Sequence, residues 1–486
     1  MKILFIIPWG KDLYGNKSIG KPAHPHLGIG YLAANCRKNG FNEVKVFDES
    51  LEQNDNLLKK TIRDFKPDLI GITVFSYCYE LFQELVDKIK IVSDAPILLG
   101  GPHVSAVRKD ALSLKGIDFA MKGEVETSFI VFLKELQKKS PNYKNVPNLI
   151  WCDKKGEVIE NENGPLITSL DNLSFPDYAD FKLEKYNYFQ TKTMPIITSR
   201  GCPYRCNYCS VRLSMGQKFR ARSPENVLGE IEYWVKQGYK NFEINDDCFS
   251  LDMERAKKIC DLISEKNLKI TYQLYNGIRV DRIDEELLYK MKESGCIFIS
   301  FGVESGNQAI IDMIGKGIKL KQVTAIVNLA NKIGISNSAN FIIGHPGETY
   351  KTAMETLEFA KNLPTNFVNV YNLIPYPGTD LYNWIEKNAG WIYHPDYVLR
   401  RIGSRDLKPA FETKEFTEGE RIKVLKEGFS LYEKTILRFR FGKTIGKFFY
   451  FLSKNRKLFN WGMKTALENK IGFKIYSMVS SRSKNK

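Results

Sequence analysis

Residues 199–210 read Ser199-Arg200-Gly201-Cys202-Pro203-Tyr204-Arg205-Cys206-Asn207-Tyr208-Cys209-Ser210. The three cysteines follow the spacing CxxxCxxC, which gathers three thiolates in one short loop. Thiolates are the ligands that iron–sulfur clusters prefer. No fourth cysteine follows at a matching distance, so a cubic cluster held by this loop would keep one iron free. An electron carrier normally caps that iron, and a free iron therefore indicates chemistry on a bound small molecule.

The alternative for this loop is a zinc ion or a purely structural role. Zinc sites usually consist of two pairs of ligands, often with histidine, and this stretch has neither a second pair nor a nearby histidine. Residues Pro195-Ile196-Ile197-Thr198 are predicted to form a short buried strand that runs directly into the loop.

The loop, placed after a predicted strand, resembles the defining motif of the radical S-adenosylmethionine (SAM) superfamily. In that family the free iron binds the amino and carboxylate groups of SAM. An electron from a flavodoxin- or ferredoxin-type donor then breaks the sulfonium bond and yields a 5′-deoxyadenosyl radical. The resemblance implies that Cys202, Cys206 and Cys209 hold a [4Fe-4S] cluster and that Tyr208 lies near the adenine of SAM.

The composition bounds the class of protein. At 486 residues the chain exceeds one ordinary core, so two or three domains are expected. The first eight residues are too short for a signal peptide, and no run of 18 apolar residues predicts a membrane-spanning helix. Nine cysteines without a secretory signal indicate a reducing cytoplasm. The six cysteines outside the motif are expected to act as small buried apolar residues: Cys36, Cys78, Cys152, Cys248, Cys260 and Cys296.

Residues 1–140 alternate apolar runs with amphipathic stretches, which predicts an α/β domain with a doubly wound, Rossmann-like parallel sheet. The predicted strands are residues 2–7, 44–47, 69–74, 97–99 and 119–121, and the predicted helices are residues 27–38, 56–65, 79–92 and 126–138. Ligands bind such sheets at the carboxyl ends of the strands. Small and polar residues collect there, in Thr73-Val74-Phe75-Ser76, Gly100-Gly101-Pro102-His103 and Gly123-Glu124-Val125-Glu126.

These strand ends, in this order, resemble the cobalamin-binding domain that precedes the barrel in one class of radical SAM enzymes. The resemblance implies that Thr73, Ser76, Gly100 and Gly101 line the slot for the nucleotide tail of cobalamin. The alternative is a bare sheet domain that has lost its cofactor.

The family's DxHxxG motif, which carries the histidine ligand of cobalt, is missing. His24 and His26 lie in Pro22-Ala23-His24-Pro25-His26-Leu27-Gly28 without its aspartate, so cobalt would have no protein histidine below it. His103 is expected to be a strand-end residue hydrogen-bonded to backbone, and not a cobalt ligand.

Residues 141–190 show no sustained period and are predicted to connect the domains, whereas residues 191–400 again alternate strand and helix and predict an open α/β barrel. Asp246 and Asp247 follow a predicted strand; the resemblance favours them as partners of the SAM amino group, and the alternative is a helix N-cap. Arg279 is a candidate for the SAM carboxylate, with a surface ion pair as the alternative.

Two later motifs match regions that contact SAM in the superfamily. Ser300 and Glu304 lie in the region that contacts the ribose and amino groups. Gly344 lies in the turn that places backbone groups against adenine, and Glu348 belongs to the same turn or caps the next helix. Tyr371-Asn372-Leu373-Ile374-Pro375-Tyr376-Pro377-Gly378-Thr379 closes the barrel with an apolar edge and a turn.

Residues 401–486 are predicted as a basic helical extension. Of the net charge of +16, residues 434–486 carry +13, from 14 Lys or Arg against Glu468 alone. Helical spacing would place Phe441, Ile445, Phe448, Phe449 and Leu452 on one face with lysines beside it. This pattern suits an anionic membrane surface, a nucleic acid, or packing on the barrel with a solvated basic face.

The two resemblances together imply a cobalamin-dependent radical SAM enzyme, with a [4Fe-4S] cluster, SAM and cobalamin as cofactors. Its expected reaction is C-methylation of an unactivated carbon on a small molecule, a secondary metabolite or a lipid. The alternatives are a radical cyclisation, oxidation or carbon–carbon coupling without methyl transfer, and an RNA modification that uses the basic tail. The enzyme is expected in the cytoplasm, with contact to the inner face of the membrane through the tail.

Overall fold

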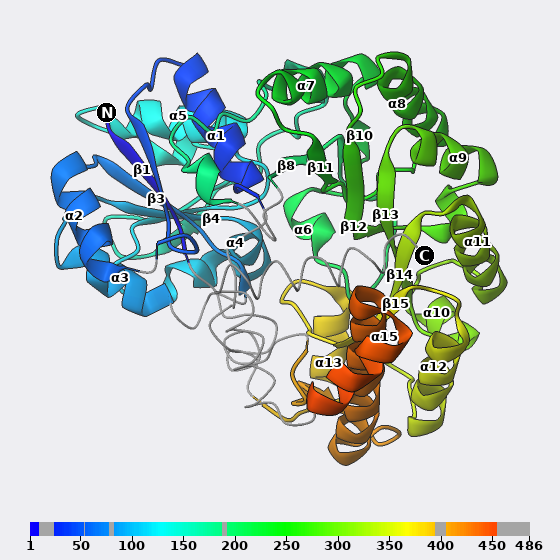
Figure 1. Ribbon diagram of the computed structural model, residues 1–486. Helices are drawn as coiled ribbons and strands as arrows, with labels where there is room; N and C mark the ends of the chain where they lie inside the picture. Colours follow the sequence, from blue (N-terminus) through cyan, green and yellow to red (C-terminus); the bar gives the residue numbers. More distant parts are fainter. Residues whose placement is uncertain (9–23, 53, 77–81, 187–191, 394–404, 454–486) are drawn as a thin grey trace.

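The computed structural model describes residues 1–8, 24–52, 54–76, 82–186, 192–393 and 405–453. Two α/β units lie side by side, one from the N-terminal residues and one from residue 192 onward (Figure 1). The last described residues form a long helix on the second unit. This arrangement confirms the predicted α/β fold with a helical C-terminal extension.

The first unit contains a seven-stranded sheet in the order β2-β1-β3-β4-β5-β6-β7. The strands are β1 (Ile3–Ile7), β2 (Val44–Asp48), β3 (Leu69–Thr73), β4 (Ile97–Gly100), β5 (Phe119–Met121), β6 (Leu149–Cys152) and β7 (Val158–Glu160). Strands β1 to β5 are parallel, which confirms the predicted doubly wound sheet.

Strands β6 and β7 are antiparallel and come from the segment 141–190, which was predicted only to connect the domains. That prediction was incomplete because strands of four and three residues are too short for a period-two pattern to stand out.

Helices cover both faces of the first sheet, as its central strands β1 and β3, which are buried along their whole length, require. On one face lie α1 (Leu27–Lys38) and α5 (Glu126–Leu136), where the rings of Phe5 and Phe129 are 5.8 Å apart. On the other lie α2 (Asp55–Phe65), α3 (Phe82–Lys90) and α4 (Pro102–Val107), whose apolar side chains pack on Leu4 and Ile6. Residues 79–81 of the predicted third helix lie outside the described residues.

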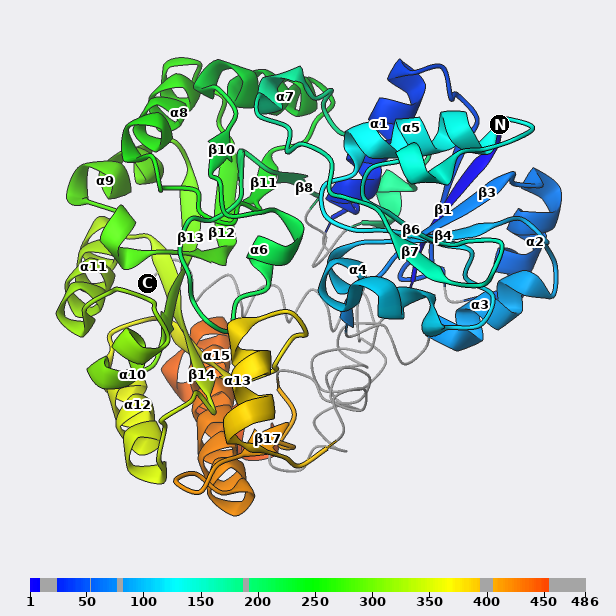
Figure 2. The ribbon, with the colours of Figure 1, turned by 180° about the vertical axis from the view of Figure 1, so that it is seen from behind.

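The second unit is an open barrel of six parallel strands in the order β8-β11-β12-β13-β14-β15. The strands are β8 (Thr193–Ile196), β11 (Asn241–Ile244), β12 (Thr271–Ile278), β13 (Cys296–Glu304), β14 (Ser336–Ile343) and β15 (Phe367–Asn372). Outside them lie α7 (Pro224–Lys236), α8 (Met253–Glu265), α9 (Glu285–Glu293), α11 (Leu320–Ile333) and α12 (Tyr350–Asn362), which Figure 2 shows from behind.

Successive side chains on each barrel strand point to opposite faces. On β13, Ile299, Phe301 and Val303 belong to the core shared with the outer helices. The alternate residues of this strand, Ser300 and Glu304 among them, therefore face the barrel interior.

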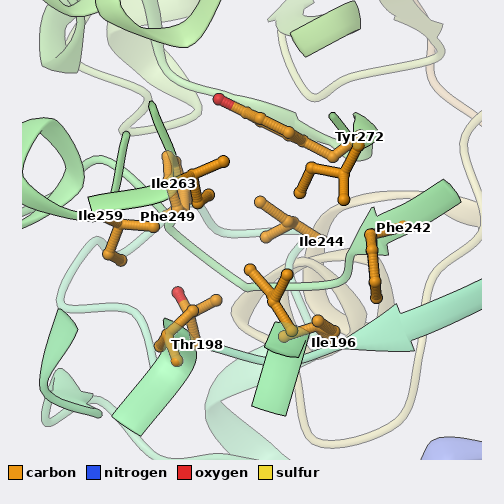
Figure 3. Close-up of a pocket in the computed structure, with 11 residues that line it drawn as sticks. Ile196, Thr198, Phe242, Ile244, Phe249, Ile259, Ile263 and Tyr272 are labelled. Atoms are coloured by element: carbon orange, nitrogen blue, oxygen red, sulfur yellow. The ribbon is translucent and has the colours of Figure 1, made fainter. Parts of the chain in front are cut away.

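A small cavity lies on the helix side of β8, β11 and β12 (Figure 3). Its wall is apolar, with Phe242, Ile244 and Phe249 among the lining residues. Its two polar residues already have partners, because Thr198 bonds to Asp246 and Tyr272 to Ser294. We assign this cavity to core packing, away from the barrel interior.

Short elements complete the second unit. They are the two-stranded ribbon of β9 (Ser199–Arg200) and β10 (Arg220–Ala221), the helices α6 (Val211–Ser214), α10 (Gln308–Met313) and α13 (Asp380–Asn388), and the pair β16 (Gly390–Trp391) and β17 (Phe411–Glu412). The ribbon brackets the cysteine loop and α6, since the loop follows β9 and α6 precedes β10.

Helix α15 (Glu418–Ser453) has two parts separated by Gly442, where φ is 77°. The first part packs on the barrel, with Val424 and Phe429 in a cluster that includes Ile343 and Val370. Within the described residues no helix has both the length and the apolar content to cross a bilayer.

The prediction that one face of the tail carries all five apolar residues is wrong, because the change of direction at Gly442 divides them. Phe441 is buried and lies 4.5 Å from the ring of Phe449, whereas Ile445 and Phe448 are exposed.

Candidate functional site

The approach to the cysteine loop is held by Asp246, a buried residue that follows β11. Its carboxylate accepts hydrogen bonds from the Thr198 amide (2.5 Å), the Thr198 hydroxyl (2.5 Å) and the Ser199 hydroxyl (2.6 Å). The helix-cap alternative for Asp246 is wrong, since Asp252 caps α8. Asp246 thus anchors the residues that lead into Cys202.

Asp247 holds the next step of the same loop, because its carboxylate accepts the Gly201 amide at 2.9 Å. Gly201 has φ of 80°, and a Cβ there would lie 2.4 Å from the Lys218 carbonyl oxygen, so only glycine fits. Burial raises the pKa of the Asp247 carboxyl to about 6 against the opposing effect of the Gly201 amide. The two neighbouring acids therefore fix the backbone on either side of Arg200.

The thiols of Cys202, Cys206 and Cys209 are partly exposed on this one loop. Among the described residues no three His, Cys, Asp or Glu side chains converge as the ligands of a single metal ion do. Three separate thiols suit a cluster, in which each cysteine binds a different iron, better than one zinc ion. The loop fits a [4Fe-4S] cluster.

Sequence reasoning missed the part that Cys248 plays beside this loop. Cys248 is buried, as predicted for a small apolar residue, but its thiol also interacts with that of Cys202. This interaction lowers the pKa of the Cys202 thiol, which favours the thiolate that a metal binds.

Glu304 lies at the end of β13 with φ of 74°, an uncommon conformation for a residue other than glycine. Its carboxylate forms a buried ion pair with Lys316 Nζ at 2.8 Å. Burial raises the pKa of the Tyr208 hydroxyl well above its ordinary value, and the charge of Glu304 adds to the shift. The strained glutamate therefore lies beside Tyr208, which stands between Cys206 and Cys209 in the chain, and such strain often accompanies function.

Arg279 lies beside Lys316 and Tyr204. Its guanidinium pairs with Asp281 at 2.9 Å, donates to the Lys316 carbonyl at 2.6 Å and lies 3.5 Å from the centre of the Tyr204 ring. The ion pair that was the alternative for Arg279 is present, with Arg279 buried and Asp281 partly exposed.

Ser300 lies deeper in the barrel interior than Glu304. Its hydroxyl is 3.0 Å from the Ser338 hydroxyl and accepts a hydrogen bond from Asn340 Nδ2, in the side chain, at 3.0 Å. Asn340 in turn accepts from Asn369 at 2.8 Å. A polar row therefore crosses β13, β14 and β15 inside the barrel.

The Gly344–Glu348 turn follows β14, and Glu348 binds the amides of Gly344 (2.6 Å) and His345 (3.1 Å). The helix-cap alternative for Glu348 is wrong, because Thr349 caps α12. Arg421 of α15 donates to the Gly344 carbonyl at 3.1 Å, a contact that sequence reasoning missed. The His345 ring lies 5.4 Å from that of Tyr208, so this turn and the cysteine loop are adjacent.

The Tyr371–Thr379 segment also reaches the loop. Its residues Leu373, Ile374 and Tyr376 pack in one apolar cluster with Tyr208, which agrees with the predicted apolar edge. Thr379 caps α13, and the amide of Leu381 donates to the Asn207 carbonyl at 3.0 Å.

At the carboxyl edge of the first sheet, the predicted slot residues meet. A Cβ on Gly101, with φ of 101°, would lie 2.9 Å from the Val74 carbonyl oxygen, whereas one on Gly100 would enter open space. Ser76 and His103 are 3.0 Å apart (Oγ to Nδ1), so His103 has a side-chain partner where a backbone one was expected. The bare backbone at Gly100 and the polar rim fit a flat cofactor tail.

The side chains of His24 and His26, near this edge, both have partners within the protein. His26 caps α1 by accepting the Ile29 amide at 3.2 Å, and burial lowers the pKa of its imidazole to about 4. His24 lies 3.6 Å from Glu243 of the barrel, whose carboxylate outweighs burial and raises the pKa of the His24 ring.

Comparisons with known proteins agree with this geometry. Residues 196–360 match the Radical SAM superfamily model, and residues 18–133 match the B12 binding domain model. The chain is 31% identical over 438 residues to "Uncharacterized methyltransferase PH0819" of Pyrococcus horikoshii, which covers 88% of this chain and 92% of that protein. This chain is a cobalamin-binding radical SAM enzyme. Its cofactors are a [4Fe-4S] cluster, SAM and cobalamin.

Two further relatives are named by different reactions. The cytidylyl-2-hydroxyethylphosphonate methyltransferase of Streptomyces wedmorensis is 27% identical (73% of this chain, 76% of that one). The anaerobic magnesium-protoporphyrin IX monomethyl ester cyclase of Rubrivivax gelatinosus is 26% identical (79% and 69%). The solved structure of OxsB with aqua-cobalamin and SAM bound shares the fold at 18% identity, with a TM-score of 0.68 over 98% of this chain and 74% of that one.

Proposed function

We propose that this enzyme transfers a methyl group to an unactivated carbon of a small molecule. The observation that carries the proposal is a contact between the carboxyl edge of the first sheet, where the cobalamin slot is predicted, and the ribbon that brackets the cysteine loop. There Glu124 Oε1 lies 2.6 Å from Arg220 Nη2. Bound there, the cluster and SAM supply hydrogen-atom abstraction and cobalamin supplies the methyl group. Two relatives that are named methyltransferases support the proposal.

In this proposal the residues have distinct roles. Cys202, Cys206 and Cys209 hold the cluster, while Asp246 and Asp247 fix the loop that carries them. If Asp246 and Asp247 also bind the SAM amino group, as predicted, they do so while accepting these hydrogen bonds from residues 198–201.

The SAM pocket is proposed between Tyr208, Glu304 and the Gly344–Glu348 turn, with Arg279 and Ser300 below the loop and inside the barrel. Thr73, Ser76, Gly100 and Gly101 are proposed for the tail of cobalamin.

The test is an anaerobic assay of the reconstituted holoenzyme with methyl-deuterated SAM, a chemical reductant and a small-molecule extract of the source cells. Methyl transfer predicts a product that carries the deuterated methyl group, together with S-adenosylhomocysteine and 5′-deoxyadenosine. Deoxyadenosine without S-adenosylhomocysteine would contradict it and favour the cyclase-type reaction, which the relative named as a cyclase supports.

We also propose that the C-terminal segment contacts an anionic membrane surface. Beyond Gly442, Ile445, Phe448 and Phe451 are 43%, 60% and 73% exposed, and the charge of +13 on residues 434–486 suits anionic lipid. The full chain should sediment with phosphatidylglycerol vesicles and not with phosphatidylcholine vesicles.

A matched pair of variants tests this contact. The F448S/F451S variant should lose vesicle binding, whereas Ile91→Ser, which removes an equally exposed side chain elsewhere, should keep it. Equal sedimentation of both variants would refute the contact, and retention of tRNA by the wild type would favour the nucleic-acid alternative.

A further inference from the structure

Two arginines face each other across the ribbon that brackets the cysteine loop. Arg200 of β9 pairs in register with Arg220 of β10, and both side chains are buried. Like charges directly opposite each other destabilise an antiparallel pair. This ribbon therefore requires carboxylates from elsewhere, and Arg200 is two residues from Cys202.

The compensating carboxylates come from the other unit. Glu124, after β5 of the first sheet, accepts hydrogen bonds from both terminal nitrogens of Arg220, at 2.6 Å each. Glu126 binds Arg200 Nη2 at 2.7 Å, and Glu124 lies 3.8 Å from Arg200 Nη1. Bidentate pairs of this kind fix direction as well as distance.

Further contacts make the arrangement rigid. Arg220 also donates to the carbonyls of Ile167 (3.0 Å) and Met215 (2.7 Å), and Arg200 lies over the ring of Tyr31 in α1. The charge of Arg200 outweighs burial and lowers the pKa of the Glu126 carboxyl, so this glutamate stays ionised. The side chains of Glu124, Arg200 and Arg220 are 2–4% exposed, which removes them from competing water and salt.

We propose that Glu124 and Glu126, with Arg200 and Arg220, form an interdomain clamp that sets the distance between the cobalamin edge and the cluster loop. These four are positioning residues, and none of them is proposed to touch substrate. The proposal rests on the proposed function, since methyl transfer needs the methyl donor and the substrate radical in one fixed geometry. Misplacement by about 1 Å costs up to ~100-fold in rate.

The test compares Glu124→Gln with Glu160→Gln in the holoenzyme. Glu160 forms ion pairs with Arg108 and Lys122 inside the first unit and does not reach the barrel, which makes it the matched control. Iron content, cobalamin content and SAM affinity are measured first. The main readout is the magnetic interaction between the reduced cluster and cob(II)alamin in the electron paramagnetic resonance spectrum, which depends on their separation.

The clamp predicts that Glu124→Gln keeps its cofactors but changes this magnetic interaction, and that deoxyadenosine formed per methyl transferred rises about 10- to 100-fold. Glu160→Gln should match the wild type in both readouts. Glu124→Gln removes the carboxylate that neutralises buried guanidinium groups, so a second and less disruptive variant is Arg220→Lys. This variant keeps the positive charge but loses the bidentate contact, and it should change the spectrum less than Glu124→Gln does.

An unchanged spectrum in both clamp variants would overturn the clamp. A changed spectrum would support it even if the wild type transfers no methyl group, an outcome that would refute only the proposed function.

Discussion

Replacing Asp246 by alanine should destabilise the cysteine loop more than any other single change to the acids after β11. The substitution leaves three buried donors without an acceptor: the Thr198 amide, the Thr198 hydroxyl and the Ser199 hydroxyl. Each unsatisfied buried donor costs at least ~1 kcal/mol, so the loop should lose about 3 kcal/mol or more. The donors lie three and four residues before Cys202, and reconstitution should therefore yield less cluster.

The matched control is Asp252→Ala, which removes only the N-cap of α8. A lost N-cap costs about 1 kcal/mol, and the hydrogen bond lost is to the Arg255 amide and not to Thr198 or Ser199. Urea denaturation of the apoprotein and iron and sulfide analysis after anaerobic reconstitution compare the two. A full complement of iron in Asp246→Ala, with a free energy of unfolding within about 1 kcal/mol of that of Asp252→Ala, would refute this role of Asp246.

Three further outcomes are expected. Burial raises the pKa of the Glu348 carboxyl from 4.5 to about 7, so the folded state holds this proton more tightly than the unfolded state does. The free energy of unfolding should therefore fall, by up to about 3 kcal/mol, as the pH rises between these two values. Glu348→Gln should abolish that part of the pH dependence in urea titrations. Arg421→Met should weaken SAM binding measured by calorimetry at constant iron content, whereas the exposed Lys423→Met on the same helix should not; equal affinities would exclude a role for Arg421 in the turn. Lys316→Met should leave Glu304 as an unpaired buried charge, at a cost of about 3–5 kcal/mol, and an unchanged urea midpoint would contradict the pairing.

The sequence predicted the elements whose pattern is local. The helix at Leu27–Lys38 has its predicted bounds, since its apolar residues recur at helical spacing, and five strands of the first sheet were found from their short, mainly apolar runs. The CxxxCxxC loop was recognisable because its chemistry lies within eight residues. Strands β6 and β7 were missed because they are three or four residues long.

What the sequence did not reveal depends on residues far apart in the chain. Glu124 and Arg220 are 96 residues apart, and nothing near either one indicates the other. The same holds for Arg421, which reaches Gly344 from 77 residues away. A helix-capping role was the alternative prediction for Asp246 and for Glu348, yet Asp252 caps α8 and Thr349 caps α12. Contacts between residues so far apart in the chain can be identified only once the fold is known.

The central claim is that three cysteines hold a cluster that reductively cleaves SAM. Its most direct test is deoxyadenosine formation by reconstituted Cys206→Ala under a chemical reductant, beside Cys152→Ala, which removes an exposed cysteine far from the loop in sequence. We expect Cys152→Ala to equal the wild type, and Cys206→Ala to lose cluster iron and form no deoxyadenosine. Wild-type iron content and SAM cleavage in Cys206→Ala would contradict the account.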